Sequence, residues 1–268
     1  MKHPKYLCMD FDGTIMRYDP WPDHLDPGIV AALNALQAAG VPWIANSGRT
    51  LDGQLEILTH TAQAWGLQHW PIAVLHGECY IHVRQGHEYV SLDEWNDAAH
   101  RNLRSVQDAL RNGHKNKLDQ IINDYAPHEV FFNETVAVFR MGGEEVHRQV
   151  FMQELRSLLE DIPDAHLIQN TEWISIIHEG VGKGNLIKGY MNHLGENAED
   201  VLAIGDHGND ISMLDGSVTP LVACPGNAYE PTQRAVREAG GFIAAGPAAQ
   251  GTLEAIHHFF PVLRRTDT

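Results

Sequence analysis

The chain has 268 residues, of which 43% are hydrophobic and 20% charged, so it can bury a sizeable core in one or two globular domains. With 35 acidic and 19 basic side chains, its net charge of −16 repels nucleic acid and anionic membrane surfaces. The three cysteines form no CxxC pair, which disfavours a disulfide framework and a thiolate zinc site. Without a signal-peptide pattern or a long apolar run, the sequence predicts a cytoplasmic protein.

The first predicted strand, residues 6–9, leads directly into Asp10, Asp12 and Gly13. In an extended chain residues i and i+2 point the same way, so the two carboxylates would share one small space at the strand's carboxyl end. Like charges so close are unfavourable unless a cation lies between them or one carboxyl holds a proton. This favours an active site, with a simple Asp-Gly turn as the alternative.

The following segments alternate between helix and strand. After a loop at 19–23, Asp26 and Pro27 predict the start of a helix that ends at Gly40. We expect a strand at 41–45, a polar loop with Ser47, Gly48 and Arg49, a helix to about residue 65, and strands at 72–75 and 80–83 with a turn at 85–86.

From Leu92 the pattern changes. A polar helical stretch to about residue 125, broken at 112–113, precedes a strand candidate at 130–139, a helix at 144–159 and strands at 166–169 and 173–177. This order predicts an α+β module with its own core, which we place at residues 84–177.

The last ninety or so residues return to alternating strands and helices. A helix begins near Lys183, a buried strand at 201–205 opens into Asp206 and Asp210, and a strand at 221–224 and helices at 231–239 and 252–260 follow. The fold class is therefore α/β, with a doubly wound Rossmann-like core of parallel strands, residues 1–83 and 178–268, that carries the module as an insertion. The strand ends that carry Asp10, Ser47 and Asp206 would converge at one edge of the sheet.

Four segments in this order resemble the motifs of haloacid dehalogenase-like phosphohydrolases: Asp10 to Thr14, Ser47 to Arg49, Lys183-Gly184, and Gly205 to Asp210. The position of the insertion resembles members with a C2-type cap. The tail, with Gly226-Asn227-Ala228 and residues 251–256, is most similar to the sucrose-phosphatase-like and Cof-like sugar phosphatases.

The resemblance implies a role for each motif residue. Asp10 would be the nucleophile that becomes an aspartyl-phosphate, and Asp12 the acid that protonates the leaving oxygen and then activates water. The metal ligands for Mg²⁺ would be Asp10, the carbonyl of Asp12, Asp206 and Asp210, the last through water or Lys183. The residues that bind substrate or phosphate would be Ser47, Gly48, Arg49, Lys183 and Asn209.

Elementary chemistry agrees with these implications. Carboxylates alone would repel a phosphate ester, whereas an oxygen-rich site suits Mg²⁺, and Lys183 adds a second positive centre. Passing the phosphoryl group through a carboxylate divides a hard step into two easier ones.

Other interpretations of single residues stay open. Lys188 is a rival to Lys183, Ser47 can be a helix N-cap, and residues 206–210 can form a turn or a calcium loop, although the terminal Glu of an EF-hand is absent. His76 and His207 can line the site without reacting. The residues that could select the substrate, or serve only in packing or loops, are Trp21, Trp70, Trp95, Trp173, Asn133, Asn170 and Glu172.

We therefore expect a Mg²⁺-dependent phosphomonoester hydrolase that acts on a small phosphorylated metabolite, a sugar phosphate by family analogy. Its partners would be this small molecule and, at most, further copies of itself, as a monomer or small homo-oligomer, with no nucleic acid or membrane. A sugar phosphomutase that uses the same intermediate, or a non-catalytic sugar-phosphate sensor, are the alternatives.

Overall fold

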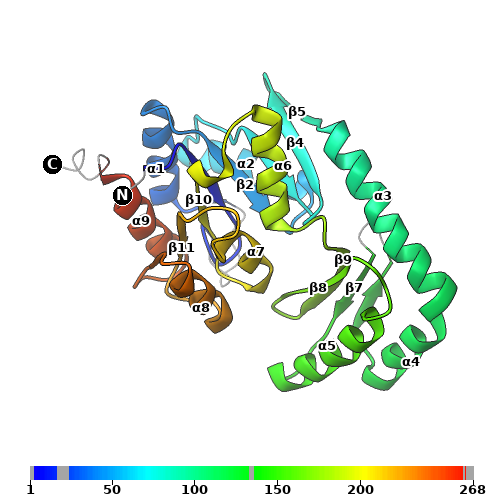
Figure 1. The fold of residues 1–268 in the computed structure, drawn as a ribbon. Coiled ribbons are helices and arrows are strands. Elements are labelled where there is room, and N and C mark those ends of the chain that lie inside the picture. Colours follow the sequence, from blue (N-terminus) through cyan, green and yellow to red (C-terminus); the bar gives the residue numbers. More distant parts are fainter. Residues whose placement is uncertain (1–2, 17–23, 133–135, 262, 264–268) are drawn as a thin grey trace. The chain divides into compact units, whose positions relative to one another are not determined.

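The structure is a computed structural model that describes residues 3–16, 24–132, 136–261 and 263. The loop expected at 19–23, with Trp21, and the candidate Asn133 lie outside these residues. The chain folds into two compact units: Met1–Leu92 together with Lys183–Thr268, and Asp93–Gly182. Each unit has its own sheet, and we describe each by itself (Figure 1).

The first unit is built on a mixed sheet in the order β12-β11-β10-β1-β2-β3-β4-β5. The six strands from β12 to β3 are parallel, and β4 and β5 extend the edge as an antiparallel hairpin. The strands are β1 (Tyr6–Met9), β2 (Trp43–Ser47), β3 (Ala73–His76), β4 (Tyr80–Gln85), β5 (Glu88–Ser91), β10 (Val201–Ile204), β11 (Val222–Cys224) and β12 (Phe242–Ile243). The α/β, doubly wound class predicted from the sequence is confirmed.

Helices cover both faces of this sheet. On one face α1 (Pro27–Ala38), α2 (Leu51–Trp65) and α9 (Ala248–Phe259) pack in a single apolar cluster with β1, and α1 lies beside α9 (Figure 1). Three more helices contact the strands of this sheet. α6 (Lys183–Leu194) contacts β3 and β4, and α7 (Ile211–Leu214) contacts β10. α8 (Glu230–Glu238) contacts β11 and β12. Leu7 and Met9 of β1 belong to the apolar cluster with α1, α2 and α9, and Cys8 between them is also fully buried, as expected for a strand buried on both faces.

Local sequence signals explain where the helices begin and end. Asp26 accepts a hydrogen bond from the Gly28 amide at 2.8 Å, and Pro27 occupies the first turn of α1. Thr50 caps α2 in the same way, and Gly66 ends it with a φ of 69°.

The second unit is an antiparallel sheet in the order β6-β7-β9-β8, with helices packed against it. Its elements are α3 (Asp93–Ala109), a π-helical turn (Leu110–His114), α4 (Lys115–Tyr125), β6 (Glu129–Phe131), β7 (Ala137–Arg140), α5 (Glu145–Leu159), β8 (Ala165–Asn170) and β9 (Trp173–His178). Phe139 of β7 meets Phe151 of α5 edge to face at 5.3 Å, and both are fully buried, so the unit has a core of its own.

Several expected boundaries need correction. The boundary expected at residue 84 falls inside β4, because the hairpin partner β5 belongs to the first sheet and the second unit begins only at Asp93. The boundary expected at 178 falls on the last residue of β9, and the second unit continues to Gly182. The break expected at 112–113 is a π-helical turn within a continuous helical segment. Its hydrogen bonds join residues five positions apart, so the helix accommodates an additional residue in this turn without ending. The single strand expected at 130–139 is an antiparallel pair, β6 and β7.

Among the described residues, no helix has both the length and the apolar character needed to cross a membrane.

Candidate active site

The motif residues gather at one edge of the first unit's sheet. The chain runs from β1 outward to β2 and β3 in one direction, and from β10 outward to β11 and β12 in the other, so β1 and β10 flank the point where the strand order reverses. Ligands of open α/β sheets bind at this point, outside the carboxyl ends of the strands. Asp10 follows β1, and Asp206 follows β10 after one glycine.

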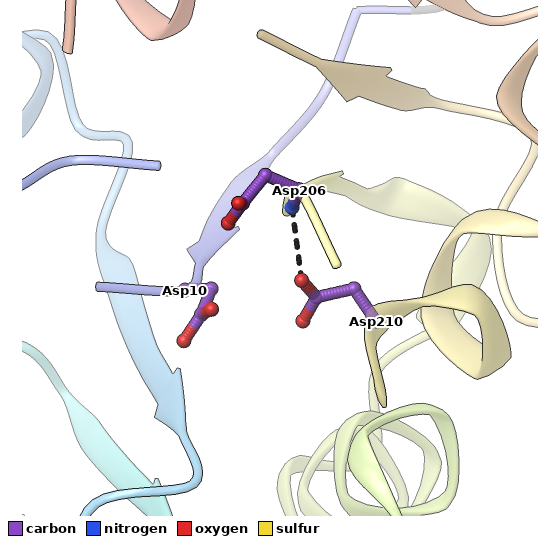
Figure 2. A group of neighbouring side chains, drawn as sticks. All are labelled: Asp10, Asp206 and Asp210. Carbon is purple, nitrogen blue, oxygen red and sulfur yellow. Dashed lines mark hydrogen bonds between the residues drawn. The ribbon is translucent and has the colours of Figure 1, made fainter. Parts of the chain in front are cut away.

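Three buried carboxylates meet there. Each of Asp10, Asp206 and Asp210 offers an oxygen, and these atoms all lie within 4.8 Å of one another. Figure 2 shows the side chains of Asp206 and Asp210 extending toward Asp10. Their exposed fractions are 3%, 2% and 0%, so water screens their mutual repulsion poorly.

Asp210 fixes the loop after β10. Its Oδ2 accepts hydrogen bonds from the amides of Asp206 and His207, both at 2.9 Å; the first is the dashed line in Figure 2. A Cβ on Gly205 would lie 2.5 Å from Cγ of Asp210, so only glycine leaves room for this carboxylate to fold back over the loop.

Lys183, the first residue of α6, supplies the positive charge inside the cluster. Its Nζ donates to Oδ1 of Asp210 at 2.6 Å and lies 2.9 Å from Oδ1 of Asp10, and its side chain is completely buried. Burial opposes the charged ammonium, but Asp10, Asp210 and Glu78 together raise the pKa of Lys183 well above its usual value.

Burial is also the main reason that the pKa of Asp10 is raised well above its usual value; Lys183 opposes this effect, and Asp210, Asp206 and Asp12 reinforce it. When all are ionised, three carboxylates against one ammonium leave two negative charges in excess. A small divalent cation would offset that excess, and hard oxygen donors are the ligands that Mg²⁺ prefers. The donor set therefore fits the metal that the sequence led us to expect.

The other residues of the first motif are held by neighbours from distant segments. Gly13 has a φ of 75°, which lets the chain turn sharply after Asp12. Thr14 donates from Oγ1 to Oδ1 of Asp206 at 2.9 Å, and Asn227 donates to the Gly13 carbonyl at 3.0 Å. The carboxylate of Asp12 is paired with the guanidinium of Arg49 through two hydrogen bonds of 2.8 Å.

The residues expected to bind phosphate differ in their surroundings. Ser47 is the last residue of β2, is 1% exposed, and accepts a hydrogen bond from the Arg49 amide at 3.3 Å. Gly48 follows it, and a Cβ at this position would make a tight contact of 3.1 Å with Oε1 of Glu78. Asn209 is buried and donates from Nδ2 to that same Glu78 oxygen at 2.8 Å.

Glu78 is the site residue that sequence reasoning missed. It lies in the turn between β3 and β4, is 8% exposed, and has a φ of 63°, which is uncommon for a residue with a side chain. Burial raises the pKa of its carboxyl group, and Lys183 and Asn209 partly oppose this. Its Oε2 has no hydrogen-bond partner among the described residues. The only signal in the sequence was an acidic residue after a glycine in a hairpin turn, which by itself resembles any exposed turn.

Comparison with known proteins gives the family. The family model of haloacid dehalogenase-like hydrolases matches residues 72–234, more than half of the chain. The chain belongs to this family. The recognition made from the four motifs is thus confirmed.

Curated relatives match this chain either over part of its length or at low identity. A phosphoglycolate phosphatase of Methanospirillum hungatei is 33% identical over 115 residues, which are 42% of this chain and 46% of that protein. One of Methanosarcina acetivorans is 22% identical over 189 residues, 69% of this chain and 81% of that protein. The chain thus matches about half the length of the first relative.

Solved structures share the fold over nearly the whole chain. The sucrose-phosphatase of Synechocystis, solved with sucrose and phosphate, has a TM-score of 0.70 at 18% identity and covers 97% of this chain and 98% of its own. The subclass IIB sugar phosphatase BT4131 has a TM-score of 0.63 at 18% identity, covering 95% and 98%.

Five of the alternative residues weighed from the sequence are either exposed or have structural partners. Lys188 is exposed on α6, unlike the buried Lys183. His207 stacks on Tyr229 at 5.0 Å, and His76 contacts His82 with 3.0 Å between ring nitrogens. In the second unit, Trp173 stacks on Phe131 at 6.2 Å, and Glu172 accepts a hydrogen bond from Arg140.

Proposed function

We propose that the protein is a Mg²⁺-dependent phosphomonoester hydrolase that transfers the phosphoryl group of a small metabolite to Asp10 and then to water. One observation carries the proposal: the carboxylate of Asp10 lies 2.9 Å from the buried ammonium of Lys183, beside two further carboxylates, at the reversal point of the sheet. A buried nucleophilic carboxylate beside a fixed cation and an oxygen-rich cation site suits phosphoryl transfer, which depends on positioning and charge stabilisation.

The reaction has two steps. In the first, an oxygen of Asp10 bonds to phosphorus while the bond from phosphorus to the ester oxygen breaks, and the carboxyl group of Asp12 gives its proton to that oxygen. In the second, the carboxylate of Asp12 takes a proton from water, the water oxygen bonds to phosphorus, and the bond to Asp10 breaks. A positioned acid or base of this kind contributes about 10²–10⁴-fold to the rate.

The remaining residues would hold the phosphoryl group and the metal. We assign the phosphoryl oxygens to Lys183, the Ser47 hydroxyl and the amide of Gly48. Asn209, which is held by its hydrogen bond to Glu78, would help to position these phosphate-binding groups. Asp10, Asp206 and the carbonyl of Asp12 would hold Mg²⁺, which supplies positive charge against the phosphate. Both oxygens of Asp210 already accept hydrogen bonds, so we assign it to holding Lys183 and the loop, with contact to the metal through water.

A sugar or polyol phosphate is the substrate class that we propose. The support is the shared fold with the two sugar phosphatases. The names of the curated relatives suggest phosphoglycolate as a second candidate.

The test combines one variant with metal removal. We expect the wild type to release inorganic phosphate from at least one member of a panel of phosphorylated sugars, polyols and small acids. Asp10→Asn should lose about 10³-fold or more in kcat while keeping its circular dichroism spectrum. EDTA should abolish turnover and added Mg²⁺ restore it. Full activity of Asp10→Asn, or activity in EDTA, would refute the mechanism.

Labelled substrate separates the alternatives. Hydrolysis sends the label of a [³²P]sugar phosphate to free phosphate, whereas a mutase would return it to the sugar at another position. A sensor would bind the labelled ligand without changing it.

A further inference from the structure

The first motif contains two carboxylates, and each has a different cation. Lys183 contacts Asp10 and Asp210. Asp12 instead meets the guanidinium of Arg49, whose Nε donates to Oδ2 and whose Nη2 donates to Oδ1, both at 2.8 Å. Two parallel charge-assisted bonds fix the position of a carboxylate and also the orientation of its plane.

The Arg49–Asp12 pair is sheltered from solvent. The side chain of Arg49 is 24% exposed and that of Asp12 is 16% exposed. A pair at this depth is screened less than a surface ion pair, and its two-bond geometry needs the planar fork of arginine. Arg49 can therefore hold Asp12 in one place rather than in a range of surface conformations.

The backbone under Arg49 is itself anchored. Its carbonyl accepts hydrogen bonds from the Gly77 amide at 3.1 Å and from the side chain of Gln54 at 3.3 Å. Gln54 is fully buried in α2 and also donates to the carbonyl of Leu75 in β3 at 3.1 Å. The guanidinium thus extends from a segment that is bound both to α2 and to the hairpin of β3 and β4.

We propose that Arg49 is a positioning residue for the acid–base carboxyl group of Asp12, and that it does not serve as a phosphate-binding residue. The inference rests on the proposed function, in which Asp12 exchanges a proton with the leaving oxygen and with water. To bind phosphate, the guanidinium would have to give up both bonds to Asp12. As a positioning residue it keeps them, and it acts on the substrate only through Asp12.

This assignment predicts a dependence on the leaving group. An alcohol that leaves as an alkoxide needs a proton from Asp12, whereas p-nitrophenolate is stable enough to leave without one. A displacement of a catalytic group by about 1 Å costs about 10²-fold in rate. Loss of Arg49 should therefore harm the hydrolysis of an alkyl phosphate far more than that of an activated aryl phosphate.

The experiment compares kcat/KM for glycerol 2-phosphate and p-nitrophenyl phosphate, because this parameter reports the step that expels the leaving group. In Arg49→Ala we expect a loss of about 10²-fold for glycerol 2-phosphate and less than about 10-fold for p-nitrophenyl phosphate. Asp12→Asn should show the same selective loss, and Arg49→Lys should recover part of it, since an ammonium keeps the charge but not the paired bonds. Arg234→Ala, which removes an exposed arginine on α8, is the matched control and should match the wild type.

Phosphate binding provides a readout that needs no turnover. Calorimetry with inorganic phosphate and Mg²⁺ should give the same Kd for wild type and Arg49→Ala within about twofold, because the proposed role of Arg49 involves no contact with phosphate. A factor of two in Kd is a small free-energy difference. A tenfold weaker Kd with equal losses for both substrates would overturn the inference in favour of a phosphate-binding role. Equal losses with an unchanged Kd would also overturn it and indicate a structural role.

Two controls separate this inference from the proposed function. If Asp10→Asn is inactive and the wild type hydrolyses both esters, the proposed function stands and the substrate ratio of the Arg49 variants alone decides. If the wild type hydrolyses neither ester nor any member of the metabolite panel, the proposed function fails and takes this inference with it. Should Arg49→Ala not fold, as judged by circular dichroism, Arg49→Gln and Arg49→Lys carry the same comparison.

Discussion

Lys183 is the residue on which the charge balance of the site depends. It is fully buried, and its ammonium lies between the carboxylates of Asp10 and Asp210. Each of these three charges has lost most of its hydration, so each depends on the others. Removing one partner of such a buried group costs more than the pair itself contributes, because the remaining charges stay desolvated.

We therefore expect Lys183→Met to lower the free energy of unfolding of the metal-free protein by about 3–5 kcal/mol. Urea denaturation in EDTA measures this loss. Mg²⁺ should restore a larger share of the stability in the variant than it adds to the wild type, since the variant has more uncompensated negative charge. Lys188→Met on the same helix, where the side chain is exposed, is the control and should stay within about 0.5 kcal/mol of the wild type. Equal losses in both variants would contradict this assignment.

The residue scale also shows what the sequence could predict. Asp10, Asp206, Asp210 and Lys183 were expected at one edge of the sheet, and the structure places them together, because strand ends in a parallel sheet leave little choice of location. The partner of Asp12 could not be predicted, since Arg49 could extend to a phosphate or to a carboxylate from the same backbone position. Glu78 was missed because its burial follows from the turn conformation after β3, which the sequence does not specify.

Among the elements, the hairpin of β3 and β4 connects the sheet edge to the site. It carries Glu78 in its turn, and His76 at the end of β3 lies 3.0 Å from His82 of β4, measured between ring nitrogens. Burial, and to a lesser extent His82, lowers the pKa of His76 to about 4. The folded protein thus keeps this imidazole neutral where an unfolded chain, with a pKa near 6.5, would protonate it.

This difference predicts a specific dependence of stability on pH. Between about pH 6.5 and 4 the unfolded chain binds a proton at His76 that the folded protein does not, so the contribution is fully present above about pH 6.5 and is lost as the pH falls toward 4. Relative to the neutral substitution His76→Gln, the wild type should lose on the order of 2–3 kcal/mol of unfolding free energy over this range. Urea denaturation of both proteins at several pH values measures the difference, and parallel curves would contradict it.

The sequence predicted long elements more reliably than short ones. α1 and α2 begin and end close to the expected residues, because Asp26, Thr50 and Gly66 give local signals for capping. β5 and β12 were missed, since β5 is partly exposed at the edge of the sheet and β12 has only two residues, so neither contains a buried apolar run. The pair β6 and β7 was taken as one strand because both halves are apolar and β-branched or aromatic, with no Gly or Pro between them.

At the scale of the whole molecule, the two units have separate sheets, and no strand pair of the described residues joins one sheet to the other. The apolar cluster formed by β1, α1, α2 and α9 belongs entirely to the first unit. The first unit therefore has the hydrogen bonds and the core that independent folding requires.

The boundaries of a deletion that removes the second unit should decide whether the first unit folds alone. A variant in which residues 93–182 are replaced by a short flexible linker keeps β4 and β5 whole, and we expect it to unfold cooperatively, with the circular dichroism of an α/β protein. The matched variant lacks residues 84–177, the boundaries expected from the sequence. It loses β5 and the end of β4, and leaves residues 178–182 of the second unit, of which only His178 belongs to β9, attached to α6.

The second variant should be less stable than the first and more prone to aggregate, because it loses the hydrogen bonds between β4 and β5 and makes the more buried strand β4 the edge of the sheet. Thermal denaturation and size-exclusion chromatography of the two variants make the comparison. If both melt alike, β5 contributes nothing to the first unit. If neither folds, that unit depends on residues 93–182, and the cluster of Asp10, Asp206 and Asp210 would then require the whole chain for its assembly, although all three residues belong to the first unit.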